Sequence, residues 1–359
     1  MPEAAELRLV DCPPPRHFPA MVKLCRALLE VADEEFGPEW ILDVAADPVR
    51  FQSLACLLGY ERNTSGSTTV VTAALREAAD PEEHGVLVVG GKGKLARRVP
   101  EILDETAPEL GLDPDRLKEA SLLTARSDTR CLQDGHDLYH HVILVSVDTG
   151  RWVVVQQGMN VPRKTARRYH WKDEDVREFV EEHPVHADEK AEVLSLQGEK
   201  ASGCREAVLD LISEGPRRIL RAWSEMKTSV KGPLDAYIDD RDGHPGRLRP
   251  EELPPRPDPR ALETLHEIEP VDFTEYLRVD AAGPSLTRAL ALIAEFMYGE
   301  EPDRRDPAEY TTAFGCKSGD PYPVDPELME LAAEVLEREG SRAVKRLLDR
   351  RLRGMRTGR

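Results

Sequence analysis

Residues 138–157 read LYHHVILVSVDTGRWVVVQQ, which is two strand-like runs around a turn. The runs, Leu138–Val147 and Trp152–Gln157, are rich in β-branched residues, which favour strands. Asp148-Thr149-Gly150 lies between them and is typical of a hairpin turn. We therefore expect two central antiparallel strands here.

The residues before this hairpin predict a domain that mixes helices and strands. Met21–Asp33 and the region 38–60 carry apolar residues at helical spacing, and a hydroxyl-rich turn at 64–69 leads into a helix over 70–79. Val86–Val89 is a short buried strand, followed by a glycine loop and a helix. Residues 1–190 should thus form an α/β domain with a small, mainly antiparallel sheet.

The residues after the hairpin are mostly helical. We expect a helical extension over 191–238 and a linker over 239–260, where six prolines and many charges leave few apolar residues. Residues 261–359 should form an all-α domain, with a loop at 311–324 and a helix over 326–353. The expected class is α+β in two domains, as a length of 359 residues suggests.

The charge of the chain is uneven. The net charge is −18, which counts against a uniformly basic nucleic-acid binder. Ser341–Arg359 nevertheless carries eight basic residues and one acid, a local charge of +7, and such a tail can neutralise phosphates. The chain has no apolar run of about 18 residues and no signal-peptide pattern, so we expect a cytoplasmic protein with no membrane partner. The six cysteines are scattered, which indicates neither a zinc site nor a disulfide framework.

Tyr276–Glu295 (YLRVDAAGPSLTRALALIAE) has the pattern of a degenerate helix-hairpin-helix. In that motif a glycine-containing hairpin brings backbone N–H groups near a phosphate at the start of the second helix. The candidate phosphate contacts are Gly283, Ser285, Thr287 and Arg288. An ordinary helical hairpin in a core is the alternative.

Two basic segments are further candidates for nucleic-acid contact. Gly90–Lys94 (GGKGK) offers Lys92 and Lys94 between a strand and a helix, although it lacks the spacing of a P-loop. Arg163–Lys172 (RKTARRYHWK) mixes cations for phosphates with aromatic rings for bases. Its candidate residues are Arg163, Lys164, Arg167, Arg168, Tyr169 and Trp171. The alternatives are a solvated glycine turn for the first segment and a strand anchored to the core for the second.

Ser127–His141 (SDTRCLQDGHDLYHH) collects carboxylates and imidazoles before the first strand of the hairpin. Asp128, Asp134 and His140 could hold Mg²⁺ or Mn²⁺ and orient a water against a phosphodiester. The catalytic candidates are Asp128, Asp134, His136, His140, Gln156 and Lys94, with Lys94 neutralising charge on the phosphoryl group. His140 and His141 should face opposite sides of a strand. A satisfied polar network is the alternative, and no GxSxG motif indicates a serine hydrolase.

Several segments together resemble one family. They are TTVVTAALREA (Thr68–Ala78), GGKGK, LQDGHDLYHHV (Leu132–Val142), VVQQGMN (Val154–Asn160), ARRYHW (Ala166–Trp171), GPSLTRALALIAEFMYG (Gly283–Gly299) and PYPVD (Pro321–Asp325). This combination is similar to the DUF763 family of prokaryotic proteins, over most of residues 35–325. The resemblance implies a C-terminal helix-hairpin-helix and no particular mechanism. Ala281 and Ser285 stand where the family favours glycine and lysine, and the first twenty residues also depart from its pattern.

These patterns favour a nucleic-acid-binding protein of DNA repair or processing, with DNA preferred to RNA and a metal-dependent nuclease as its expected chemistry. Two alternatives stay open. One is a non-catalytic DNA- or RNA-binding factor. The other is an enzyme acting on a phosphorylated small molecule at the GGKGK segment.

Overall fold

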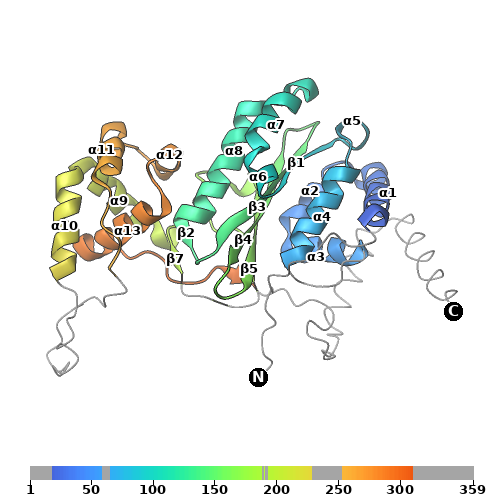
Figure 1. The fold of residues 1–359 in the computed structure, drawn as a ribbon. Helices are drawn as coiled ribbons and strands as arrows, with labels where there is room; N and C mark the ends of the chain where they lie inside the picture. Colours follow the sequence, from blue (N-terminus) through green and yellow to red (C-terminus); the bar gives the residue numbers. More distant parts are fainter. Residues whose placement is uncertain (1–17, 59–64, 188–189, 191–192, 229–252, 310–359) are drawn as a thin grey trace, which may run out of the picture.

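The computed structural model describes residues 18–58, 65–187, 190, 193–228 and 253–309. Most of the predicted linker, the loop predicted at 311–324, the helix predicted at 326–353 and the basic tail lie outside these residues. Figure 1 shows a central sheet between two sets of helices and a further group of helices beside it. The predicted α+β class is confirmed.

The central sheet has six strands. Their order is β1 (Val86–Lys92), β3 (Asp137–Ser146), β4 (Trp152–Asn160), β5 (Thr165–Lys172), β6 (Val185–His186) and β8 (Ala308–Glu309). Neighbouring strands are antiparallel, except that β8 lies parallel to β6. A separate pair joins β2 (Leu132–Gln133) to β7 (Leu194–Ser195). The predicted hairpin of residues 138–157 is β3 and β4, so this prediction is confirmed.

The sheet is covered on both faces. Val88, Leu144 and Val153 enter one core, whereas their neighbours Val89 and Ile143 enter the other. Alternate residues of a strand point to opposite faces, so a sheet with two covered faces needs nearly continuous apolar runs. The continuous β-branched runs in β3 and β4 are explained by burial of both faces of these strands.

Two sets of helices cover these faces (Figure 1). On one face lie α1 (Phe18–Phe36), α2 (Trp40–Ala46), α3 (Pro48–Leu57), α4 (Ser65–Ala78) and α5 (Pro81–His84). After β1 come α6 (Lys94–Arg97), α7 (Val99–Thr106), the 3-10 turn η1 (Pro108–Leu110), α8 (Pro114–Arg126) and the π-helical η2 (Ser127–Cys131). Of these, α7 and α8 pack on the opposite face. The Asp113 side chain accepts hydrogen bonds from the first free N–H groups of α8, which fixes where that helix begins.

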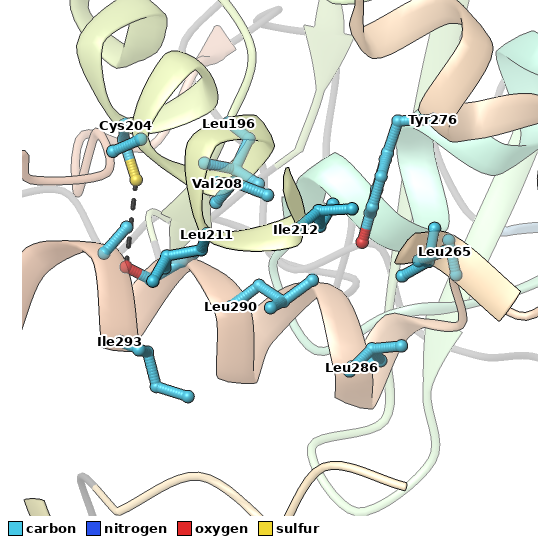
Figure 2. Close-up of a cluster of buried hydrophobic side chains, with 14 of the residues drawn as sticks. Leu196, Cys204, Val208, Leu211, Ile212, Leu265, Tyr276, Leu286, Leu290 and Ile293 are labelled. Atoms are coloured by element: carbon cyan, nitrogen blue, oxygen red, sulfur yellow. Dashed lines mark hydrogen bonds between the residues drawn. The ribbon is translucent and has the colours of Figure 1, made fainter. Parts of the chain in front are cut away.

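The remaining helices share a third core. Short 3-10 turns, η3 (Asp173–Asp175) and η4 (Glu199–Ala201), precede α9 (Ser202–Glu214), α10 (Pro216–Thr228), α11 (Pro259–Ile268), α12 (Phe273–Arg278) and α13 (Pro284–Tyr298). Figure 2 shows Leu290 of α13 beside Leu211 and Ile212 of α9, and Leu286 and Ile293 of α13 belong to the same core. No helix among the described residues is long and apolar enough to cross a membrane.

The helical group that follows the sheet begins earlier in the chain than the sequence predicted. The sequence indicated an extension over 191–238 that was separate from the last domain, but α9 and α10 pack in the same core as α11 to α13. Apolar residues of α9 and α13 pack against each other in this core. The composition of the linker between these helices did not indicate that they share a core. After α13 the chain first pairs Asp303 with Ser195 of β7, and then joins the central sheet where β8 lies beside β6.

Gly90 should be indispensable for the sheet. It has a φ of +119°, and a Cβ on this residue would lie 2.2 Å from the carbonyl oxygen of His141 on β3. We expect Gly90→Ala to lower the free energy of unfolding by about 3 kcal/mol, because it adds a backbone clash to an unfavourable φ. Urea unfolding followed by tryptophan fluorescence measures this loss.

Gly111, which follows η1, provides the matched control for this prediction. It also has a positive φ, +71°, in the left-handed helical region, and a Cβ there would meet nothing within 4 Å. Gly111→Ala should cost only about 1 kcal/mol, the conformational penalty alone. Equal losses in the two variants would contradict the role given to the close approach of β1 and β3.

Candidate functional site

One end of the central sheet is polar on both of its faces. On the face toward α4, the register aligns one row across five strands: Lys92, His140, Gln157, Arg168 and His186. On the face toward α8, the neighbouring row holds His141, Gln156 and Tyr169. Of these residues only Lys92 is exposed. Most of the predicted catalytic residues therefore lie at this polar end, inside the protein.

On the α4 face, His140 is held as a neutral imidazole. The Thr72 hydroxyl donates to the carbonyl of Thr68 at 2.8 Å, so it accepts from Nε2–H of His140 at 2.9 Å. Burial lowers the pKa of His140 to about 3, and the nearby positive charges of Arg76 and Lys92 act in the same direction. The second ring nitrogen, Nδ1, is buried and has no hydrogen-bond partner.

On the α8 face, Asp128 is surrounded by donors. Its Oδ2 accepts hydrogen bonds from the Trp171 indole at 2.9 Å and from the Gln156 amide. Its Oδ1 accepts from the Gln197 amide at 3.3 Å and lies 2.9 Å from Nε2 of His183. The His183 ring also stacks on Trp171, with centroids 3.9 Å apart. The carboxylate of Asp128 is thus already solvated by the protein.

Gln156 connects Asp128 to a buried serine and histidine. The Gln156 oxygen can only accept, so Nδ1–H of His141 donates to it at 2.8 Å, and Nε2 of His141 then accepts from the Ser121 hydroxyl at 2.7 Å. A serine hydrogen-bonded to an oriented imidazole is the arrangement of an activated nucleophile. Here Ser121 of α8 and His141 of β3 are both buried where the helix packs on the sheet, so the arrangement satisfies polar groups inside the core.

Asp134 lies in a second buried network on the same face. It accepts hydrogen bonds from the Tyr169 hydroxyl at 2.8 Å, from Arg167 at 3.2 Å and from the backbone N–H of His136 at 2.9 Å. Arg167 also binds both carboxylate oxygens of Asp306. Burial alone would raise the pKa of Asp134, but the His136 hydrogen bond and the Arg167 charge hold it below its usual value. Asp134 is therefore an ionised partner in an ion-pair cluster.

The predicted metal ligands do not come together. His140 faces α4, whereas Asp128 and Asp134 lie on the other face, each among its own donors. In the described part of the chain, no group of three or more His, Cys, Asp or Glu side chains could hold a metal ion. The strand alternation that separates His140 from His141 also separates His140 from the carboxylates. Lys94 is exposed at the start of α6 and has no hydrogen bond or ion pair to either carboxylate.

Most of the predicted contacts in Arg163–Lys172 are buried in β5. Arg167, Tyr169 and Trp171 face the Asp134 and Asp128 networks, whereas Arg168 faces α3, where its guanidinium lies 4.4 Å from the centroid of the Phe51 ring. This corrects the prediction that these four residues bind nucleic acid. The alternative of a strand anchored to the core is what the structure shows. Arg163 and Lys164 are exposed in the turn before β5.

The GGKGK segment is mostly strand and not a loop. β1 continues through Gly90, Gly91 and Lys92, and only Gly93 separates it from α6. The first two glycines serve close packing, since a Cβ on Gly91 would meet the Arg76 guanidinium at 2.9 Å. Lys92 and Lys94 remain exposed on either side of Gly93.

The predicted helix-hairpin-helix region contains two helices, α12 and α13, joined by five residues. The hairpin faces the rest of the protein, because Arg126 and Arg130 donate to the carbonyls of Leu277, Arg278 and Val279. Thr287 is buried, and its hydroxyl is hydrogen-bonded to Tyr276 and to the carbonyl of Gly283. Thr287 is thus unavailable as a phosphate contact, which corrects that prediction.

The other three candidates at this hairpin differ in exposure. Gly283 precedes the first residue of α13 with an ordinary φ of −71°, and Ser285 is exposed. Arg288 is half-buried, and burial and the charge of Arg304 lower its pKa. None of these three residues forms a side-chain hydrogen bond or ion pair with the described residues at the polar end of the sheet.

Sequence inspection missed several residues that are hydrogen-bonded or ion-paired to the buried polar groups at this end of the sheet. They are Thr68, Thr72, Ser121, His183, Gln197 and Asp306. All lie far along the chain from the residues they contact. The paired polar residues His140-His141, Gln156-Gln157 and Arg168-Tyr169 are a signal that could have indicated them. A polar pair that interrupts an apolar strand places polar groups on both covered faces, and each group then needs a partner from a covering helix or loop.

The comparisons with known proteins give a family and no further relative. A family model, described as a protein of unknown function (DUF763), matches residues 3–324. No curated protein and no solved structure matched the chain in the other two comparisons. The matched residues include the whole sheet, both buried networks and the helical group. The chain therefore belongs to the DUF763 family.

Proposed function

We propose that the protein binds nucleic acid at the polar end of its sheet, through a surface that we call the basic end. This surface consists of the exposed residues Lys92, Lys94, Arg97, Arg163 and Lys164. β1 ends at Lys92, and the turn between β4 and β5 lies at the same end of the sheet, as the register of the strands requires. Two basic segments far apart in sequence thus share one surface.

The lack of carboxylate partners is the observation that carries this proposal. None of the five cations forms an ion pair within the described residues, although arginines elsewhere on the surface, such as Arg98, Arg151 and Arg278, are paired with glutamates. Asp137, at the start of β3, is an exposed acid at the same end. In a chain of net charge −18, a group of unpaired cations is suited to an anionic partner.

The proposal includes binding without cleavage. Asp128 and Asp134 each accept several hydrogen bonds from the protein, so neither carboxylate is available to activate a water at a phosphodiester. DNA cleavage in Mg²⁺ or Mn²⁺ by the wild type, abolished in Asp134→Asn, would contradict this part of the proposal.

Salt dependence of binding is the first test. The dissociation constant for a labelled DNA duplex of about 20 base pairs should rise roughly 40- to 500-fold between 50 and 200 mM salt, as three to five phosphate contacts require. Fluorescence anisotropy measures this change. Binding that does not respond to salt, or no binding, would overturn the proposal.

Matched charge variants test the location. Replacing Lys92, Lys94, Arg163 and Lys164 with glutamine should weaken binding by about 30-fold or more at 100 mM salt. The control replaces four exposed cations of α10 with glutamine: Arg217, Arg218, Arg221 and Lys227. It changes the net charge equally, away from the sheet (Figure 1), and should change affinity less than 3-fold. Equal losses in both variants would show that net charge, not the basic end, determines binding.

A further inference from the structure

We propose that the turn between β4 and β5, residues 161–164, is a rigid wedge that enters a groove of duplex DNA and bends it. This inference rests on the proposed function and names its substrate class. The turn follows the last strand pair, Asn160 with Thr165, and all four of its residues are exposed. Their sequence is Val-Pro-Arg-Lys, so an apolar pair precedes a basic pair.

The turn is held in one conformation. Lys164 N–H donates to the carbonyl of Val161 at 3.2 Å, and Arg163 N–H donates to the side-chain oxygen of Asn160 at 3.0 Å. Pro162 occupies the second position of the turn, where its fixed φ is favourable. Such a turn loses little conformational entropy when it inserts between other groups.

Two residues of the turn are unfavourable for the stability of the folded protein. Val161 is 64% exposed, although a β-branched apolar residue has no stabilising contact in such a position. Lys164 has a φ of +56°, where glycine or asparagine would be less strained. A turn selected only for stability would use other residues at both positions, so we infer that the apolar tip and the charge of Lys164 serve a contact.

The surroundings of Val161 favour DNA over other partners. Val271 is even more exposed, at 77%, but it lies near Glu269, Asp272 and Glu275, which would repel phosphates. Val161 has Arg163 and Lys164 beside it, and the other cations of the basic end lie at the same end of the sheet. Apolar side chains that part a base step, flanked by cations on the phosphates, are an established way to kink a duplex.

A duplex is favoured over a single strand because the aromatic residues of this region are buried. Single strands are bound by stacking bases on exposed rings. Tyr169 and Trp171 lie inside the core, and Tyr139 is half-buried with its hydroxyl hydrogen-bonded to Gln157. The exposed groups at the turn suit a groove and its phosphates.

Bending and binding are measured separately in the test. A duplex of about 20 base pairs, with dyes at its ends and a central TA step, should show increased energy transfer when the wild-type protein binds. Val161→Ser should retain affinity within about 5-fold and lose at least two thirds of the change in energy transfer. Val271→Ser, the control, should retain both.

The outcomes separate the two proposals. If the wild type does not bind, or binds without salt dependence, the proposed function itself fails. If it binds with salt dependence but leaves the duplex straight, or if Val161→Ser bends it as the wild type does, only the wedge fails. Equal affinity for a single strand of the same length would also overturn the wedge, and circular dichroism confirms that both serine variants are folded.

Discussion

Lowering the pH from 7 to 4 should remove much of the stability of this protein, because histidines are buried as neutral rings. His140 has a pKa of about 3 in the folded protein, against 6.5 for an unperturbed histidine, and burial is the main cause. Below pH 6.5 the unfolded chain binds a proton that the folded protein excludes, so stability is fully present above this pH and falls as the pH decreases toward 3. A shift of this size corresponds to a total loss on the order of 5 kcal/mol.

Two other histidines act in the same direction. Burial lowers the pKa of His141 and of His170, whose Nδ1–H donates to the carbonyl of Ala45 at 2.7 Å. A typical folding free energy is about 5–15 kcal/mol, so these groups together should cause unfolding in mild acid. Urea unfolding at pH 7, 6, 5 and 4 measures the decline.

The contribution of His140 can be isolated with one substitution. His140→Gln keeps an N–H that can reach Thr72 but removes the titrating ring. Its stability should fall less steeply between pH 6 and 4, by about 1.4 kcal/mol per pH unit relative to the wild type. His266→Gln is the control, because His266 lies exposed on α11. Parallel acid curves for the wild type and His140→Gln would contradict the burial argument.

Replacing Asp306 should cost about 3–5 kcal/mol of unfolding free energy. Arg167 and Asp306 are both almost fully buried and joined by a two-point ion pair, with Asp134 as the second acceptor for Arg167. Asp306→Ala leaves a buried guanidinium with half of its charge compensation, and removing one partner of a buried pair is strongly destabilising. Thermal and urea unfolding measure the loss.

Asp280 is the matched control for this substitution. It also forms an ion pair with an arginine, Arg126, but its side chain is 90% exposed. Asp280→Ala should cost less than about 1 kcal/mol. In addition, Arg167→Met combined with Asp306→Ala should recover part of the loss, because no unpaired charge then remains buried. Similar losses for Asp306→Ala and Asp280→Ala would show that the pair is not buried in solution.

Asp306 also ties the two parts of the chain together. It lies just before β8, in the segment that returns from α13 to the sheet, and it contacts the first residues of β5 through Arg167. Nothing in the local sequence around residue 306 indicates this partner, because the contact spans 139 positions.

The elements of the fold follow mainly from local patterns. β-branched runs around Asp148–Gly150 predicted β3 and β4, and the apolar spacing of Met21–Asp33 predicted a helix that lies within α1, Phe18–Phe36. The buried polar network was foreseen as an alternative for Ser127–His141, and the anchored strand as an alternative for Arg163–Lys172. In both cases the charged side chains looked functional because the sequence does not show which of them are covered.

By itself, the sequence predicted β1, β3 and β4, most of the helices and the mixed class, because propensity and periodicity act over a few residues. Only the tertiary structure decided which polar residues meet. It placed His140 on one face of the sheet and Asp128 and Asp134 on the other. It also buried Arg167 and Trp171 in the core and brought Lys92 to the same end of the sheet as Lys164. The physical reason is that strand register and helix packing join residues far apart in the chain, and burial then turns the same charged side chain from a surface ligand into an internal partner.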